Sequence, residues 1–295
     1  MQPWRMTLAA ALPAVALVAG VRADTPQELA NRRVVSAFYE QAFGAKDVAA
    51  ALQFLGPGYV EHDPSTADGQ EGLAAHIARL KEAHPQSRHE VTQVVAEGDH
   101  VVLHVHVVDA PGSRGESMAH IYRLDGGRIV EHWGMTQPVP DTPNPDNPNS
   151  AFGLASPAGA ASTATGPRDR AREARHKQIV TDFYNAALNE KNWEKAVRFI
   201  GPRYTQHSLY APDGPGGLRD LVDRLRDQFP LNRGEIKRAF VDRDLVVLHL
   251  RVRRTPEVQG WCVFEMMQLE DDKVVEHWDT FQTVPTSSAN GHPMC

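Results

Sequence analysis

An internal repeat constrains this sequence more than any other feature. Motifs in the first half of the chain return in the second half, always 145 positions later (278 − 133, for example). The matched motifs are Phe38-Tyr39 and Phe183-Tyr184, Gly56-Pro57 and Gly201-Pro202, Tyr59 and Tyr204, His62 and His207, and Glu131-His132-Trp133 and Glu276-His277-Trp278. A constant offset across about a hundred residues indicates duplication of a whole domain, because solenoid repeats span only about 20–45 residues. We therefore predict two copies of one small domain.

The two predicted domains occupy residues 24–140 and 170–286. Before them, Arg5, the apolar stretch Leu8–Gly20 and Val21-Arg22-Ala23 are typical of a signal peptide. Residues 1–23 are therefore expected to be removed during export to the periplasm or the medium. Residues 141–169 are rich in Pro, Asn, Ala and Gly, which predicts a flexible linker. Residues 287–295 are predicted to form a disordered tail.

Charge and cysteine content exclude several classes of protein. The net charge is −6 and no concentrated basic face is apparent, so no nucleic-acid partner is expected. No segment after the signal peptide is long and apolar enough to span a membrane. Cys262 lies in a predicted strand and Cys295 is the last residue, which favours a buried free thiol at Cys262, although exported proteins can keep disulfides. Neither cysteine belongs to a CxxC motif.

Each copy contains helices first and strands afterwards. In the first copy, apolar spacing predicts a helix around 29–43, a shorter helix over 48–55 that stops at Gly56-Pro57, and a third around 73–80. Strand-like runs follow near 88–97, 100–109, 117–125 and 128–137, with turn residues between them. This order predicts an α+β domain in which three helices pack on an antiparallel sheet.

One strand is apolar on both of its faces. From Val101 to Val108, the side chains pointing to either side of the sheet are mostly valine and leucine, and the same holds from Leu245 to Val252. The helices of one domain can cover only one face of its sheet. We therefore expect the two sheets to pack against each other as an intramolecular pseudo-dimer.

The motifs resemble those of a known family. Tyr59-Val60-Glu61-His62-Asp63-Pro64 and the late-strand segment Val274-Val275-Glu276-His277-Trp278-Asp279 are similar to motifs of the SnoaL-like branch of the NTF2-like superfamily. The resemblance implies two cone-shaped domains, each with a curved sheet around an apolar pocket. Better-known members are polyketide cyclases, which close a ring by aldol condensation without metal or organic cofactor. The implied ligand is a small hydrophobic carbonyl compound, and no metal or other cofactor is expected.

The resemblance also implies catalytic residues. In the second copy it places the base at Asp279 and its acid partner at Glu265, and the corresponding residues of the first copy are Gly134 and His120. Positions 265 and 279 lie on consecutive predicted strands, so a hairpin can bring them side by side. Because only the second copy has ionisable groups at both positions, we expect it to be the catalytic one. The first copy either uses His120 alone as its base, since a histidine pKa lies near neutrality, or is a non-catalytic partner domain.

Further residues are candidates for the pocket. The resemblance places His62 and His207 in catalytic or pocket-lining positions, together with Tyr59 and Tyr204. His104 and His249 could serve either as pocket donors or as core residues. His132 and His277 adjoin tryptophans, which favours a packing role. The cluster of His62, His104 and His120 could bind zinc, but no acidic or cysteine ligand has the spacing of a metal motif.

Three functions agree with the sequence. The first is an exported acid–base enzyme of the cyclase, isomerase or hydratase kind that needs no cofactor. The second is a binding protein for a small hydrophobic ligand, and the third is a structural module that presents a surface to a partner. An open pocket lined by the candidate acids and bases would favour the first two, whereas a filled cone would favour the third.

Overall fold

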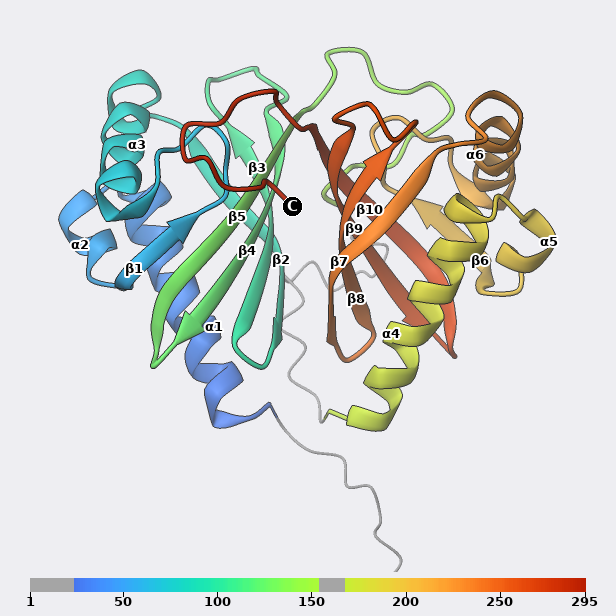
Figure 1. Ribbon diagram of the computed structural model, residues 1–295, viewed down its shortest axis with the longest axis horizontal. Helices are drawn as coiled ribbons and strands as arrows, with labels where there is room; N and C mark the ends of the chain where they lie inside the picture. Colours follow the sequence, from blue (N-terminus) through green and yellow to red (C-terminus); the bar gives the residue numbers. More distant parts are fainter. Residues whose placement is uncertain (1–23, 154–167) are drawn as a thin grey trace, which may run out of the picture.

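The chain folds into two similar α+β domains whose sheets face each other (Figure 1). The computed structural model describes residues 24–153 and 168–295. The expected signal peptide, residues 1–23, and the middle of the expected linker, 154–167, lie outside the described residues. Within the described ranges, no helix is long and apolar enough to cross a membrane.

The first domain begins with a long helix, α1 (Pro26–Tyr39), which continues into one π-helical turn, η1 (Glu40–Gly44). The start of α1 is fixed by a capping box, in which the Thr25 side chain accepts from the Glu28 amide and the Glu28 carboxylate accepts from the Thr25 amide. The remaining elements are α2 (Val48–Leu52), β1 (Leu55–Glu61), α3 (Gly69–Ala83), β2 (Arg88–Glu97), β3 (His100–Val108), β4 (Glu116–Asp125) and β5 (Arg128–Pro138).

The sheet has one strand more than the sequence indicated. Its order is β1-β5-β4-β3-β2, and β1 runs parallel to β5 at the edge, so the sheet is mixed rather than wholly antiparallel. The segment was interpreted as a helix stop because it contains Gly56-Pro57-Gly58. Proline is tolerated in an edge strand, and the register shifts between Leu55 and Val60, which accommodates these residues.

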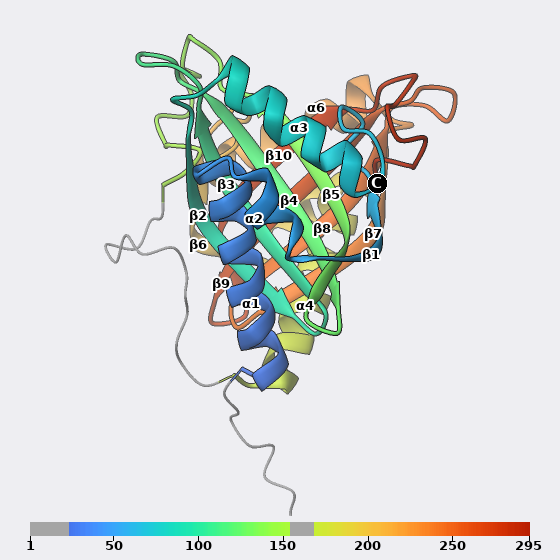
Figure 2. The ribbon, with the colours of Figure 1, turned by 90° about the vertical axis from the view of Figure 1, so that its left-hand side faces the viewer.

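The second domain repeats the same order of elements. They are α4 (Arg170–Tyr184), η2 (Asn185–Asn189), α5 (Trp193–Ala196), β6 (Ile200–Gln206), α6 (Gly214–Gln228), β7 (Arg233–Asp242), β8 (Leu245–Arg253), β9 (Trp261–Glu270) and β10 (Lys273–Thr283). Its sheet order, β6-β10-β9-β8-β7, matches that of the first domain strand for strand. The helices of each domain cover the outer face of its own sheet and form a core with it (Figures 1 and 2).

A third core lies between the two sheets. It is made of buried side chains from both domains, including Val102, Ile121 and Trp133 from the first and Val247 and Phe264 from the second. Reciprocal hydrogen bonds join the facing strands: the Thr136 amide donates to the Gln282 side chain (2.9 Å), and the Phe281 amide donates to Gln137 (3.1 Å). Residues 136 and 281 are repeat equivalents, as are residues 137 and 282, so the two bonds are the same contact made once in each direction. The contact therefore has the self-complementary form of a two-fold interface.

The segment that follows each domain crosses onto the other one. Residues 141–153, here called the linker arm, lie on the second domain, where Asn147 Nδ2 donates to the carbonyls of Ser208 (3.0 Å) and Ala211 (2.9 Å). Residues 286–295, the C-terminal arm, lie on the first domain (Figure 1), where Asn290 Nδ2 donates to the carbonyls of Asp63 (2.6 Å) and Thr66 (3.0 Å). Positions 208 and 211 are the repeat equivalents of 63 and 66.

Two expectations about these segments do not hold. The tail is not disordered: Met294 is buried and Cys295 forms a disulfide with Cys262, so Cys262 is not a free thiol either. The described parts of the linker are mostly exposed but are held by single buried residues: Asn147 bonds to the second domain, and Arg168 is fully buried among carboxylates and carbonyls. Polar composition concealed this order because the arms are held by side-chain amides and backbone carbonyls rather than by an apolar stripe.

Candidate active site

The first domain encloses a cavity of about 280 Å³ between the concave face of its sheet and its helices. This volume is close to the lower end of the roughly 300–1,000 Å³ of ordinary ligand pockets. The residues lining it include a notable number of ionisable groups: Tyr39, Glu61, Asp63, His76, His84, His89, Asp109, Glu116, His120 and His132. Apolar side chains, among them Phe43, Leu73 and Met118, form the rest of the wall.

A chain of hydrogen bonds runs along the wall of this cavity, across neighbouring strands of the sheet. Glu61, at the end of β1, accepts from His132 Nδ1 on β5 (2.8 Å). His132 Nε2 lies 3.0 Å from Nδ1 of His120, on β4. If Glu61 is ionised and His132 is neutral, His132 carries its one ring proton on Nδ1, and His120 must then donate from its own Nδ1 to His132 Nε2. This pattern leaves Nε2 of His120 as a proton acceptor.

Burial controls the protonation of these groups. Desolvation lowers the pKa of His120 well below its usual value, and the neighbouring histidines lower it further, so His120 is uncharged. Burial also opposes ionisation of Glu61, but its interaction with His132 and its hydrogen bonds outweigh that effect and lower its pKa. Glu61, at one end of the chain of hydrogen bonds, is therefore a carboxylate, while His120, at the other end, is a neutral imidazole.

Two further polar groups approach His120. Tyr39 Oη, from the end of α1, lies 3.5 Å from His120 Nε2 and 3.3 Å from His89 Nδ1. Burial raises the pKa of the Tyr39 phenol, which keeps it a hydrogen-bond donor. Burial lowers the pKa of His89 to about 4, so this imidazole is neutral as well. The cavity thus offers neutral donors and acceptors around His120.

The first domain has Gly134 where the second has the expected base Asp279, so no acid was expected at this place. The structure places the carboxylate of Asp63 there. Gly134 lies opposite His120 in the β4–β5 pair, and a Cβ atom at Gly134 would lie 3.0 Å from the Asp63 carboxylate. The carboxylate of Asp63, from the loop after β1, therefore lies where a side chain at position 134 would begin. The first domain has an acid at this place, although it comes from a different strand end.

The corresponding cavity of the second domain is much smaller, about 60 Å³. This is far below the roughly 300 Å³ at the lower end of ordinary ligand pockets. Glu265 and Asp279 are directly paired across β9 and β10, as the sequence predicted, and both line this space. His277 lies between them and Gln206: its Nε2 contacts the Glu265 carboxylate and its Nδ1 lies 2.7 Å from Gln206 Oε1.

Asp279 has a pKa suited to proton transfer. Burial and the charge of Glu265 raise this pKa, His277 and Ser208 act in the opposite direction, and the net result is a pKa of about 6. One of its carboxylate oxygens, Oδ1, has no hydrogen-bond partner among the described residues. The contact with Glu265 raises the pKa of His277 despite its burial, so this histidine is the cationic partner of Glu265.

Comparisons with known proteins agree with this geometry. A family profile of the SnoaL-like domain matches residues 35–132, and a profile of the SnoaL-like polyketide cyclase family matches residues 178–289. The chain consists of two SnoaL-like domains in tandem. A comparison with curated proteins finds no match.

Solved structures similar to this chain align with one SnoaL-like domain at a time. A protein from Jannaschia sp. CCS1 classed with the SnoaL-like polyketide cyclases has 23% identity and a TM-score of 0.34, covering 38% of this chain and 89% of that one. An NTF2-like protein from Mesorhizobium loti has 17% identity and a TM-score of 0.33, covering 38% and 93%. TsrD from Streptomyces laurentii has 19% identity and a TM-score of 0.32, covering 37% and 89%.

The structure brings some of the expected site residues into the two cavities. His120 lines the cavity of the first SnoaL-like domain, and Glu265, Asp279 and Tyr204 line that of the second. Tyr59 lies behind the first cavity, where its hydroxyl donates to Glu61 (2.7 Å). Tyr59 therefore supports the carboxylate of the histidine chain and does not border the cavity.

The other expected residues lie between the domains. His62 and His207 stack on Trp133 and Trp278 with ring centroids 4.7 Å apart in both cases, and each contacts a carbonyl of a crossing arm. They do not line either cavity, which corrects their assignment as pocket or catalytic residues.

His104 and His249 also lie outside both cavities. They occupy the face of β3 and β8 that is turned toward the other sheet, where His104 packs on Phe264 of the second domain. Burial lowers the pKa of each to about 3, so both are neutral and serve as satisfied core residues.

The sequence interpretation missed the centre of the site. His132 and His277 were assigned to packing because of their tryptophan neighbours, yet the tryptophans point into the core between the sheets and the histidines point the other way. Strand alternation, which puts adjacent residues on opposite faces, was the signal that could have separated the two roles. Glu61 and Asp63 had no such signal, since their contacts depend on the parallel pairing of β1 with β5.

Proposed function

We propose that this chain is an acid–base enzyme that removes a proton next to the carbonyl group of a small, largely apolar compound, and that the first domain performs the reaction with side chains alone. The observation that supports this most directly is the Glu61–His132–His120 chain, which ends at a cavity large enough for a small organic molecule. Cyclisation by aldol condensation and isomerisation through an enolate both begin with this step.

The hydrogen-bond pattern supplies a route for the proton. His120 Nε2 takes a proton from the carbon next to the carbonyl, and the electron pair of that C–H bond moves onto the carbonyl oxygen as an enolate. The Nδ1 proton of His120 passes to His132 Nε2, so the positive charge settles beside the Glu61 carboxylate. A histidine that is difficult to protonate alone can therefore act as a base, because the charge does not remain on it.

Tyr39 can stabilise the enolate oxygen. Its hydroxyl borders the same cavity next to His120 and is held in the protonated form by burial. A preorganised neutral donor in a site with little water stabilises developing negative charge strongly. The enolate then attacks a second carbonyl, which closes a ring, or is reprotonated at another carbon, which isomerises the compound.

A second location for the chemistry has one specific observation in its favour. The pKa of Asp279 is raised to about 6, close to the value that suits a general base. A substrate would need the second cavity to widen well beyond its 60 Å³. We therefore propose the first domain as the reactive one and the second mainly as its structural partner.

We also propose that the chain is exported. The signal-like segment supports this, and so does the disulfide between Cys262 and Cys295, because disulfides persist in oxidising compartments and are rare in the cytosol. N-terminal sequencing of protein recovered from the native host should find a mature chain that starts at Asp24. A chain still starting at Met1 would contradict the proposal.

Deuterium exchange tests the catalytic proposal without knowledge of the natural substrate. Cyclohexanone, 1-indanone and 2-tetralone would be incubated with the protein in deuterated water, and loss of the signals next to the carbonyl followed by NMR. We expect faster exchange with at least one ketone, and a loss of about 10²–10⁴-fold for His120→Gln, the usual contribution of a general base. Glu265→Gln, at the equivalent position of the second domain, is the matched control and should retain the activity.

Other outcomes would point to the other two functions. If no ketone exchanges faster than in buffer but 2-tetralone binds the first cavity by NMR titration, the chain is a binding protein. If neither exchange nor binding is observed, the structural role gains support. If Glu265→Gln loses the activity and His120→Gln keeps it, the reactive domain is the second one.

A further inference from the structure

The C-terminal arm, residues 286–295, forms part of the support of the first cavity. The loop that follows β1, residues 62–68 and here called the wall loop, contributes Asp63, Ser65 and Thr66 to the cavity lining. The arm holds this loop from outside, since Asn290 Nδ2 donates to the carbonyls of Asp63 and Thr66. The Ala289 amide donates to the Pro64 carbonyl (2.9 Å), which adds a third bond.

Two histidines extend this contact on either side. His292, in the arm, lies 3.1 Å from the carboxylate of Asp68, and His62, in the wall loop, lies 2.8 Å from the Pro293 carbonyl. The bonds thus reach from one end of the wall loop to the other. Few of them are shielded from water, because most residues of the arm are exposed, so the arm needs an anchor to stay in place.

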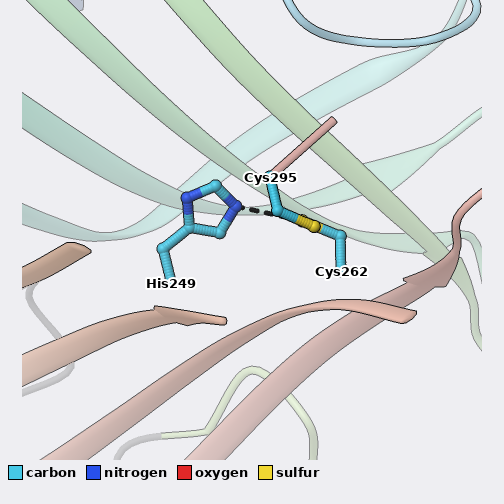
Figure 3. A group of neighbouring side chains, drawn as sticks. All are labelled: His249, Cys262 and Cys295. Carbon is cyan, nitrogen blue, oxygen red and sulfur yellow. Dashed lines mark hydrogen bonds between the residues drawn. A yellow bond between two sulfur atoms is a disulfide. The ribbon is translucent and has the colours of Figure 1, made fainter. Parts of the chain in front are cut away.

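The anchor is the disulfide at the end of the arm. Cys295 is joined to Cys262 on β9 of the second domain, and His249 on β8 lies beside them (Figure 3). Cys262 is fully buried, whereas Cys295 is only partly buried. An external thiol can therefore reach the sulfur of Cys295 more easily than that of Cys262.

Hydrogen bonding indicates a disulfide rather than a metal centre here. Two cysteines and a histidine are suitable ligand types for zinc or copper, and their donor atoms lie within 4.8 Å of one another. However, Arg238 donates to His249 Nδ1 (3.2 Å), so the imidazole proton is on Nε2, which faces the sulfur of Cys262 (3.0 Å). To bind a metal ion through Nε2, the ring would have to carry its proton on Nδ1, where Arg238 offers no acceptor, whereas a proton on Nε2 can be donated to sulfur.

We propose that the Cys262–Cys295 disulfide is a thiol-sensitive latch that holds the C-terminal arm against the wall of the first cavity. A dithiol opens it in two steps. One thiolate attacks Cys295, the Cys262 thiolate leaves and is stabilised by the N–H of His249, and the second thiol of the reagent then displaces Cys295. The products are two cysteine thiols and the oxidised dithiol. The effect on catalysis rests on the proposed function, whereas the release of the arm does not.

The second domain provides an internal control. The linker arm holds the equivalent loop there, residues 207–213, through Asn147, but it is not anchored by sulfur. Counted from these two asparagines, Phe152 of the linker arm corresponds to Cys295, and it stacks on His106 with ring centroids 3.9 Å apart. Reduction should therefore release one arm and leave the other in place.

Hydrogen–deuterium exchange read by mass spectrometry tests the latch. Oxidised protein would be compared with protein reduced by dithiothreitol, with complete reduction verified by alkylation of both cysteines. We expect amide exchange in residues 62–68 and 286–295 to become at least about tenfold faster after reduction, because the closed state loses its covalent anchor. Residues 207–213 should exchange at the same rate in both samples. Cys295→Ser should exchange like the reduced protein, with or without dithiothreitol.

The outcomes separate this proposal from the proposed function. Unchanged exchange in residues 62–68 after complete reduction would overturn the latch, whatever the activity. Equal acceleration of 62–68 and 207–213 would also overturn it, because that pattern reports general loosening. Local acceleration without ketone exchange in any sample would support the latch and contradict the catalytic proposal. Local acceleration together with slower ketone exchange in the reduced protein would support both.

Discussion

The two domains carry the acids beside their central histidines on different strands. In the first domain the carboxylates are Glu61 and Asp63, at the end of β1, and their repeat equivalents in the second domain are Gln206 and Ser208. In the second domain the carboxylates are Glu265 and Asp279, on β9 and β10, and their equivalents in the first are His120 and Gly134. Two acids therefore lie close to the central histidine of each cavity, His132 or His277, and the first cavity is lined by Asp109 and Glu116 as well.

This exchange of positions changes what the central histidine can do. His132 has a carboxylate behind it and a neutral histidine in front, so a proton entering from the cavity can move inward toward the carboxylate. His277 has a neutral amide behind it and a carboxylate in front, so its positive charge is already paired at rest. The arrangement around His132 can therefore accept a proton from the cavity, whereas His277 already carries its second ring proton and cannot accept another.

The cavities differ in volume for reasons that single residues explain. His89 of the first domain corresponds to Gly234, and a Cβ atom at Gly234 would overlap the hydroxyl of Tyr184. Tyr184 therefore extends into space that a side chain occupies in the first domain. His76 corresponds to Leu221, which lines the small second cavity. The second domain has kept the fold and lost most of the space.

Among the variants that test this difference between the two domains, Glu61→Gln is expected to have the largest effect, which is on the rate of ketone exchange. Glutamine can still accept from His132 Nδ1, as Gln206 does from His277, so the protein should fold with little change in stability. Without the carboxylate, the charge that arrives on His132 is not neutralised, and ketone exchange should fall about 10²-fold or more. Gln206→Glu is the matched change in the second domain and should leave the rate unaltered. Full activity of Glu61→Gln would show that the proton does not pass through His132.

The next effect concerns the exchanged acids Asp63 and Gly134. Gly134→Asp would place a second carboxylate against that of Asp63, because the added Cβ lies 3.0 Å from it. Crowding and unpaired charge should cost about 2–3 kcal/mol of unfolding free energy, measured with urea. The double variant Asp63→Ser, Gly134→Asp reproduces the arrangement of the second domain and should recover most of that loss. If the double variant is no more stable than Gly134→Asp alone, an acid at position 134 cannot take the place of the acid at position 63, contrary to the argument.

A third prediction uses pH. The folded pKa of Asp279 is raised to about 6, above its ordinary value of 3.8, so the folded state binds a proton that the unfolded state has released between these values. Stability should therefore fall as the pH rises from about 4 to about 6, by an amount on the order of 3 kcal/mol from this group. Asp279→Asn should lose this component, which is seen as the difference between the urea unfolding profiles of variant and parent. Identical profiles would show that Asp279 has an ordinary pKa.

The sequence allowed most of the fold to be predicted because its signals are local. Apolar spacing located the helices and the four antiparallel strands, and the repeat located the second domain. Hairpin geometry paired Glu265 with Asp279 correctly. The strand β1 was missed because Gly56-Pro57-Gly58 are turn residues in most contexts, and its parallel partner β5 is far away in the sequence.

The site was only partly predictable. On β3 both faces are apolar, so alternation cannot tell which one faces the helices, and the sequence leaves His104 and His249 open between a pocket role and a core role. The contact of Glu61 with His132 joins residues 71 positions apart and has no local signature. The arms were taken for flexible segments because their order comes from a few side-chain amides on the other domain, which composition does not reveal.

The smallest effect distinguishes the two arms. Asn147 is buried and Asn290 is partly exposed, although each donates to two carbonyls at equivalent places. Asn147→Ala leaves the buried Ser208 carbonyl without this donor, whereas the Ala211 carbonyl keeps its bond from Asn144, and the change should cost about 1–3 kcal/mol of unfolding free energy. Asn290→Ala should cost about 1 kcal/mol or less, because water can reach the freed carbonyls and the disulfide still holds the arm. Urea unfolding of both oxidised variants makes the comparison. An equal or larger loss for Asn290→Ala would mean that the C-terminal arm, and with it the wall of the first cavity, depends on this amide more than on the covalent anchor.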